Sequence, residues 1–247
     1  MKRLLFLVVL SFLVPGGCGR VGPVASMKVA GPVLPDGETT EYSILSAGRQ
    51  IGAFSTNIRH GSFRGVPAYE VVLVARTKDG AVATTDSSLI FVSRDAMVPL
   101  TSFRFILSEG STMTTAANYA DSSVAVSAYA QGTERQQLLP FGPRTYDADE
   151  LTILGRVLQI QGRQPVDIKI VSPLGPPLGG AVLDGRVSLA GSEVARVPAG
   201  SFGCYKLLFE LGPQKVTVWY EKEGLHRMVR YLTGDGDIEM QLISSRP

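Results

Sequence analysis

The sequence predicts an all-β fold, mainly antiparallel, built as a β-sandwich or a half-open β-barrel of roughly a dozen strands with one short helix. Short segments rich in β-branched and aromatic residues recur between turn signals along most of the chain. The 27 glycines and 15 prolines favour many turns over long helices. Hydrophobic residues make up 45% of the chain and charged residues 19%, which suits a packed core and excludes a disordered protein.

The N-terminus has the order of a secretory signal peptide. Lys2 and Arg3 precede an uncharged, strongly apolar run over 4–14, and a Pro-Gly-Gly stretch follows at 15–17. The apolar run is about eleven residues long, well short of the roughly 20 that a membrane-spanning helix needs. No later stretch is long enough either. We therefore expect residues 1–17 to be a signal peptide and expect no transmembrane helix.

Gly17-Cys18 resembles the end of a lipobox, the signal of bacterial lipoproteins, in which a small residue precedes the cysteine that becomes lipidated. Pro15 departs from that pattern, which usually has Leu three residues before the cysteine, so ordinary signal cleavage stays open as the alternative. The resemblance implies a membrane anchor on Cys18, where each buried methylene contributes about 0.8 kcal/mol. Gly19 and Arg20 lack the Asp of an inner-membrane retention signal, which favours the outer membrane in a cell with two membranes.

The charge of the chain argues against nucleic acid. Lys2 and Arg3 account for the whole formal net charge of +2, so the chain without its signal is formally neutral. A neutral body gives no electrostatic reason to bind nucleic acid or to dock on an anionic membrane. We therefore expect the protein to be exported to the cell envelope, facing the periplasm, and to reach the membrane only through its lipid. Without lipidation it would be a soluble periplasmic protein.

The mature chain divides into a tether, one domain and a short tail. Residues 18–41 are rich in Gly, Pro and Val without clear periodicity, and we interpret them as the lipidated N-terminus and a flexible tether. Residues 42–243 form a single β-rich domain in two halves, and 244–247 form a tail. Strands of the first half are expected at 69–76, 81–92, 97–107, 112–119 and 124–130. Turns are expected at Asp79-Gly80, Glu109-Gly110 and 120–122.

One segment, near 147–159, predicts a helix that joins the two halves. Leu151, Leu154 and Leu158 fall on one helical face. Asp147 and Glu150 have the spacing of a capping box, with Asp as the cap. A metal or acid–base site is the alternative for these acidic residues, but a helix start explains their spacing fully. Strands of the second half are expected at 166–171, 181–189, 192–198, 202–211, 216–221, 225–232 and 238–243.

A search for reactive groups gives no catalytic site. His60 and His226 have no partner at metal-ligand spacing, and a site with Cys204 would need the fold to gather all three. With Cys18 lipidated, Cys204 has no disulfide partner and is expected to be a small buried residue. The sequence contains no Gly-x-Ser-x-Gly elbow and no phosphate-binding loop, and 234–239 lacks most calcium-ligand positions. We expect no metal, no cofactor and no enzymatic activity.

A few residues of the second half are candidates for ligand binding. Trp219 and Tyr220 are neighbours on a strand, so their side chains point to opposite faces, one to the core and one to solvent or a groove. His226, Arg227 and Arg230 could contact an anionic head group. The alternative is that they form the solvated side of an edge strand, where charge deters edge pairing.

The second half also contains a recognisable series of sequence motifs. The stretch 194–202, with Pro-Ala-Gly near its end, precedes Cys204-Tyr205-Lys206 and, later, a strand with Trp219. Together with the opening strand pair at 42–52, this resembles the secreted bacterial family known as domain of unknown function 3108, over about 42–243. The resemblance implies an antiparallel β fold outside the cytoplasm. It implies no established chemistry and no catalytic residues.

These observations rank three functions. The first is a non-enzymatic cell-envelope lipoprotein that binds an apolar ligand, such as a lipid or acyl chain, in a β-sheet cavity, with the helix near 147–159 as a lid by analogy with lipoprotein carriers. The second is a structural or scaffolding envelope protein that binds another protein or a glycan through a sheet edge or face. The third is an uncharacterised hydrolase.

Overall fold

The computed structural model describes residues 27–29, 33–160, 164–175 and 178–247. The predicted signal peptide and Cys18 lie outside these residues. The described part contains seventeen strands and one short helix, which confirms the all-β prediction with more strands than the expected dozen. No helix in these ranges combines the length and apolar character needed to cross a membrane.

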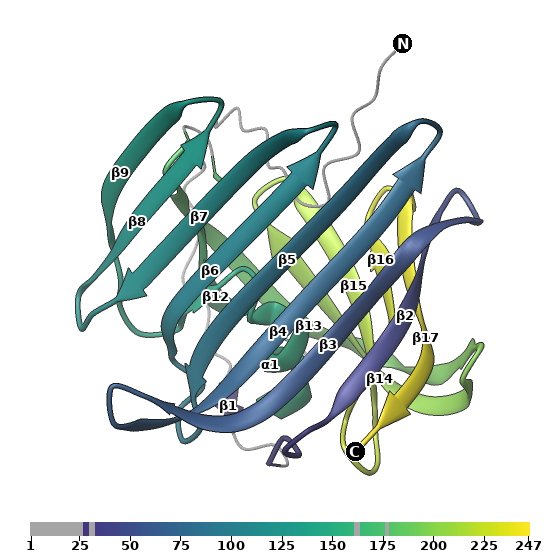
Figure 1. Cartoon of the computed structure of the whole chain (residues 1–247). Coiled ribbons are helices and arrows are strands. Elements are labelled where there is room, and N and C mark those ends of the chain that lie inside the picture. The colour runs from purple at the N-terminus through teal and green to yellow at the C-terminus, as the bar shows by residue number, and fades with distance from the viewer. Residues whose placement is uncertain (1–26, 30–32, 161–163, 176–177) are drawn as a thin grey trace.

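The first half of the chain forms the front wall in Figure 1, a run of antiparallel strands joined by hairpins. Its strands are β2 (Thr39–Ser46), β3 (Arg49–Phe63), β4 (Val66–Asp79), β5 (Val82–Ser93), β6 (Pro99–Ser108), β7 (Ser111–Tyr119), β8 (Ser123–Ala130) and β9 (Thr133–Pro140).

The second half begins with β10 (Thr145–Asp147), the helix α1 (Leu151–Val157) and β11 (Leu158–Ile160), which pairs with β1 (Met27–Val29) in a separate two-stranded sheet. It then forms the back wall in Figure 1. The strands of this wall are β12 (Val166–Ser172), β13 (Ala181–Val197), β14 (Gly200–Leu211), β15 (Gln214–Glu221), β16 (Met228–Thr233) and β17 (Ile238–Arg246).

The two walls belong to one sheet of 15 strands, in the order β10-β12-β13-β14-β15-β16-β17-β2-β3-β4-β5-β6-β7-β8-β9. The antiparallel pair of β17 and β2 joins the walls, and β10 with β12 is the one parallel pair in this sheet. The sheet curls so that the walls face each other with α1 between them (Figure 1). Its end strands β9 and β10 are not paired with each other, so the architecture is barrel-like and open.

Tight hairpins fix the register of the front wall. A two-residue hairpin loop matches the twist of its strands when both of its residues have positive φ. Glycine adopts positive φ without steric cost, and it is therefore favoured at the second position of the loop. Four hairpins of this wall have an X-Gly loop with both φ values between 49° and 83°. These loops are Ala47-Gly48, Arg64-Gly65, Glu109-Gly110 and Gln131-Gly132.

The main core fills the space between the walls and α1. Alternate residues of the strands point inward, so that β4, for example, buries Tyr69, Val71, Leu73 and Ala75. Burying a large apolar side chain, such as that of Leu73, stabilises the fold by about 1.5–3 kcal/mol. A separate small cluster on the other face of the back wall contains Cys204 and Trp219.

The expected tether is wrong for residues 33–41. Leu34 is fully buried and joins the main core, and its backbone N–H donates to the hydroxyl of Tyr69 at 3.3 Å. Glu38 is also buried, and β2 begins at Thr39. Sequence periodicity missed this segment because its contacts are long-range. The expected tail at 244–247 is likewise wrong for its first three residues, which pair with β2.

The helix is shorter than expected. Leu158 is already extended, with φ −75° and ψ 122°, so the three leucines do not share one helical face. The capping-box interpretation is half right: the Glu150 carboxylate accepts a hydrogen bond from the Asp147 N–H at 3.3 Å. The Asp147 carboxylate instead accepts from the N–H of Asp149 at 2.9 Å.

Two contacts dock α1 against the sheet. A Cβ on Gly155 would lie 2.3 Å from the ring of Tyr220, so the helix approaches β15 as closely as only glycine allows. Arg156 forms a buried ion pair with Glu38 at 2.8 Å and donates to the carbonyl of Leu225 at 2.9 Å. The helix is therefore tied to the back wall, to the entry of β2 and to the loop before β16.

We expect Gly155→Ala to lower the free energy of unfolding by about 2–4 kcal/mol, because the new methyl group overlaps the ring of Tyr220 in a packed core. Urea denaturation followed by circular dichroism measures this loss. Gly142→Ala is the matched control, since a Cβ there meets no atom within 4 Å. Equal stability of the two variants would contradict the close approach of α1 to β15.

We expect Glu38→Gln to cost about 3–5 kcal/mol, because it leaves the buried guanidinium of Arg156 without its counter-charge. Asp79→Asn is the control, since the Arg49–Asp79 pair is largely exposed and should contribute below about 1 kcal/mol. Thermal unfolding of both variants gives the comparison. If the Tm of Glu38→Gln equals that of the control variant, the buried ion pair does not hold α1 in place.

Candidate functional site

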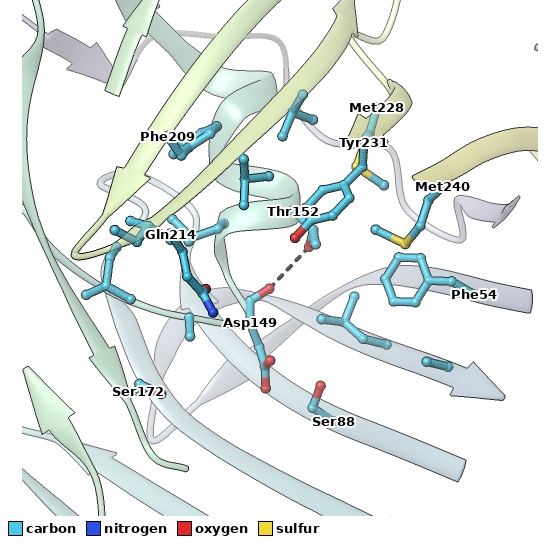
Figure 2. A pocket seen from close by; sticks show the side chains of 18 of the residues that line it. Phe54, Ser88, Asp149, Thr152, Ser172, Phe209, Gln214, Met228, Tyr231 and Met240 are labelled. Atoms are coloured by element: carbon cyan, nitrogen blue, oxygen red, sulfur yellow. Dashed lines mark hydrogen bonds between the residues drawn. The ribbon is translucent and has the colours of Figure 1, made fainter. Parts of the chain in front are cut away.

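A cavity of about 140 Å³ lies between the two walls, beside α1. Its surface is mostly apolar and includes side chains from both walls and the helix. Figure 2 shows Phe54, Met228, Tyr231 and Met240 gathered at one side of it. A cavity of about 150 Å³ lined by aliphatic and aromatic side chains holds one molecule the size of benzene. This site therefore has room for a small apolar group.

The other side of the cavity is polar. Asp149, Ser88 and Ser172 lie there, with Gln214 beside them (Figure 2). Arg104 and Asp86 also line the cavity. They come from β5, β6, β12, β15 and the turn before α1, so the fold gathers them from distant parts of the chain. The cavity thus has an apolar end and a polar end.

Arg104 is the centre of the polar end. Its Nε and Nη2 donate to both oxygens of Asp86, at 2.8 and 2.5 Å, and its Nη1 donates to Asp149 Oδ1 at 3.1 Å. All three side chains are almost buried, with exposed fractions of 11–14%. Burial alone would lower the pKa of Arg104, but the carboxylates of Asp149 and Asp86 outweigh it and raise that pKa, so the guanidinium stays charged.

Several polar side chains of the cavity make no hydrogen bond to any residue that the structure describes. Among them are Ser88 and Ser172, each at least 94% buried, together with Gln214 and Tyr231. Burial raises the pKa of Tyr231 to about 12, so its phenol keeps its proton and remains a donor. Because these side chains line the cavity, their polar groups are available to bind a ligand or water there.

Two further acidic groups lie behind the polar end. The Asp147 carboxylate accepts hydrogen bonds from the hydroxyls of Ser102, at 2.7 Å, and Tyr119. Burial and the nearby charge of Asp149 raise the pKa of Asp147 to about 6. Burial also raises the pKa of Glu150, whose Oε1 has no hydrogen-bond partner among the described residues.

The structure places the ligand-binding candidates from the sequence in different parts of the fold. Of the five ligand-binding candidates, only Tyr220 lines the cavity, and its hydroxyl lies 3.3 Å from the carbonyl of Leu151. Burial raises the pKa of Tyr220. Trp219 points to the opposite face, as expected for neighbours on a strand, and its Nε1 donates to Glu193 at 2.5 Å. It is buried rather than exposed.

The three other candidates lie outside the cavity and have protein partners. His226 Nδ1 lies 3.2 Å from the carbonyl of Arg156. Arg227 forms a two-pronged ion pair with Glu221, and Arg230 pairs with Glu239 at 2.7 Å. Each of these contacts holds a loop or strand in place. An anionic head group would have to compete with the carboxylates already bound.

The structure does not bring the histidines and Cys204 together. His60 Nε2 lies 2.7 Å from the carbonyl of Leu34, in the segment expected to be a tether. Cys204 is fully buried, and burial raises its pKa to about 11, which matches the expected small buried residue rather than a reactive thiol. Among the described residues, no three His, Cys, Asp or Glu side chains are arranged to hold a metal ion.

Asp86 and Arg104 were not predicted as site residues from the sequence. Both stand in segments that it predicted to be strands, among residues that point inward. Asp86 pairs with Ile106 and Ser88 with Arg104 in the β5–β6 ladder, which sets the two charges diagonally opposite. A charged residue at an inward position of a strand is the signal that could have found them.

The comparisons with known proteins show a family and a fold. The model of the family described as protein of unknown function (DUF3108) matches residues 41–243. A solved structure, the β-barrel-like protein of domain of unknown function DUF1849 from Brucella abortus, superposes with a TM-score of 0.57 at 10% identity, covering 87% of this chain and 98% of that chain. At that identity the likeness concerns the fold alone. No curated protein matches the chain.

We expect the free energy of unfolding to fall as pH rises from about 4 to about 7. A carboxyl whose pKa is raised on folding, as for Asp147 and Glu150, binds its proton more tightly in the folded chain. Its stabilising contribution is complete below the unfolded pKa, near 4, and is lost as pH passes the folded pKa, about 6 for Asp147. Urea titrations across this range measure the slope.

Glu150→Gln should reduce that slope, because the amide cannot lose a proton. Glu223→Gln, a change at an exposed residue, should leave the slope unaltered. Identical slopes in the unaltered chain and in Glu150→Gln would rule out the buried carboxyl of Glu150 as a contributor.

Proposed function

We propose that this chain, which belongs to the DUF3108 family of proteins of unknown function, binds a small amphipathic molecule in the cavity between its two walls. One observation carries the proposal: an apolar cavity ends in buried polar side chains that have no hydrogen-bond partner among the described residues. Binding sites for small molecules combine these features, a mostly apolar lining and a few polar groups that fix orientation.

The size of the cavity limits the ligand. About 140 Å³ accommodates a short alkyl or acyl chain or a single ring, whereas sites for drug-sized ligands measure about 300–1,000 Å³. The lipid or acyl chain expected from the sequence is therefore narrowed to a short one. Met228 and Met240 at the apolar end are unbranched and adapt to ligands of different shape.

We include in the proposal that the protein is a non-enzymatic lipoprotein of the cell envelope. The lipobox-like Gly17-Cys18 and the signal-like N-terminus support export and an anchor on Cys18. The chemistry of the cavity supports binding without turnover. No hydrogen bond joins the Ser88 hydroxyl to a base among the described residues, and Asp86 and Asp149 both pair with Arg104, which supports binding without an activated nucleophile.

A scaffolding role is the second candidate, and the outer face of the front wall favours it. Phe103 and Leu107 of β6, Tyr129 of β8 and Leu138 of β9 lie on one face of the sheet by their register, and each is 40–70% exposed. On its outer side, β9 pairs with no described strand. An exposed edge with apolar neighbours is where another protein could add a strand.

We expect the mature chain, produced with Cys18→Ser to prevent lipidation, to bind 1-hexanol as a probe in isothermal titration calorimetry. Ala75→Met should weaken binding at least tenfold, because the longer side chain fills part of the cavity that Ala75 lines. Ala83→Met is the matched control at an exposed position of β5. Absence of any binding by the unaltered chain, or equal binding by the two variants, would overturn the cavity as the ligand site.

We expect the full chain to fractionate with membranes and Cys18→Ser to fractionate with soluble protein, since the thiol is the attachment point for the lipid. Mass spectrometry of the N-terminal peptide identifies the modification. An unmodified peptide that begins after residue 18 would favour ordinary signal cleavage.

A further inference from the structure

We infer that the polar end of the ligand is a monocation, such as a primary ammonium group, rather than a carboxylate or phosphate. This inference rests on the proposed function and specifies the class of molecule that the cavity selects. Two observations support it: the charges of the side chains around the polar end, and the polar atoms there that have no hydrogen-bond partner among the described residues.

The polar end has more negative than positive charge. Among the described residues that line the cavity, Arg104 is the one cationic side chain, while Asp86 and Asp149 provide two carboxylates. The acidic groups behind them, Asp147 and Glu150, add negative charge when ionised and none when protonated. In either state, a surplus of at least one negative charge remains beside the cavity.

The hydrogen bonds show which carboxylate oxygen at the polar end is available to a ligand. Both oxygens of Asp86 are occupied by Arg104, but Asp149 engages Arg104 through Oδ1 alone. Asp149 Oδ2 accepts no hydrogen bond from a described residue. The side chains of Asp149 and Ser88 both line the cavity (Figure 2). An ammonium group has three donors and no acceptor, which suits a cavity that offers a carboxylate oxygen and serine hydroxyls.

The buried serines are a second, independent observation. Ser88 and Ser172 are 6% and 4% exposed, line the cavity and have no hydrogen-bond partner among the described side chains. A hydroxyl accepts as readily as it donates, so these groups alone would tolerate either sign of charge. The carboxylates decide the sign, because the interaction between unlike charges strengthens in a site shielded from water and an anion there would be repelled.

The test compares three six-carbon probes, hexylamine, 1-hexanol and hexanoate. The protein is the mature chain with Cys18→Ser and no change in the cavity. Isothermal titration calorimetry at pH 7.5 and low salt should give at least tenfold tighter binding for hexylamine than for hexanoate, with 1-hexanol between them. Asp149→Asn should reduce the ratio at least tenfold, because it removes the surplus charge. Asp121→Asn, at an exposed turn, should leave the ratio unchanged.

The two proposals fail in different ways. If none of the three probes binds, the proposed function itself fails. If 1-hexanol binds and hexanoate binds as tightly as hexylamine, the cavity stands as the ligand site and the inferred charge preference is wrong. The ranking of the three probes is measured on the unaltered residues, so it does not depend on whether Asp149→Asn folds.

Discussion

The packing of α1 inside the curve of the sheet is the contact on which the rest of the site depends. Gly155 lets the helix contact the ring of Tyr220, and Arg156 forms a buried ion pair with Glu38. Just before the helix, Asp147 accepts hydrogen bonds from Ser102 of β6 and Tyr119 of β7. One short segment therefore contacts strands of both walls.

The cavity is a consequence of this arrangement. Two sheets packed face to face normally interdigitate their side chains, with a spacing of about 10 Å. Here the helix occupies part of the interior and holds the walls apart, and the space beside it stays partly unfilled. The turn that starts the helix also delivers Asp149 to Arg104, so the element that keeps the walls apart contributes to the polar end as well.

The sequence predicts the features of this fold that arise from local interactions. Alternation and the Gly-containing turns predict most strands, and Gln131-Gly132 is the signal by which β9 could have been found despite its polar composition. The segment 33–41 and the polar end could not be predicted in this way. Glu38 pairs with Arg156, which is 118 residues away along the chain, and Arg104 pairs with Asp149, which is 45 residues away.

Stability alone does not explain the charged groups at the polar end. Moving three charges out of water costs several kcal/mol for each ion, and well-packed apolar residues in place of a buried ion cluster are often as stable or more so. Asp86 is enough to neutralise Arg104, through two hydrogen bonds. The carboxylate of Asp149 is thus an additional buried charge, held with one oxygen unbonded beside a cavity. The cationic group that we infer for the ligand would give this carboxylate a second partner of opposite charge, and so would offset part of the cost of burying it.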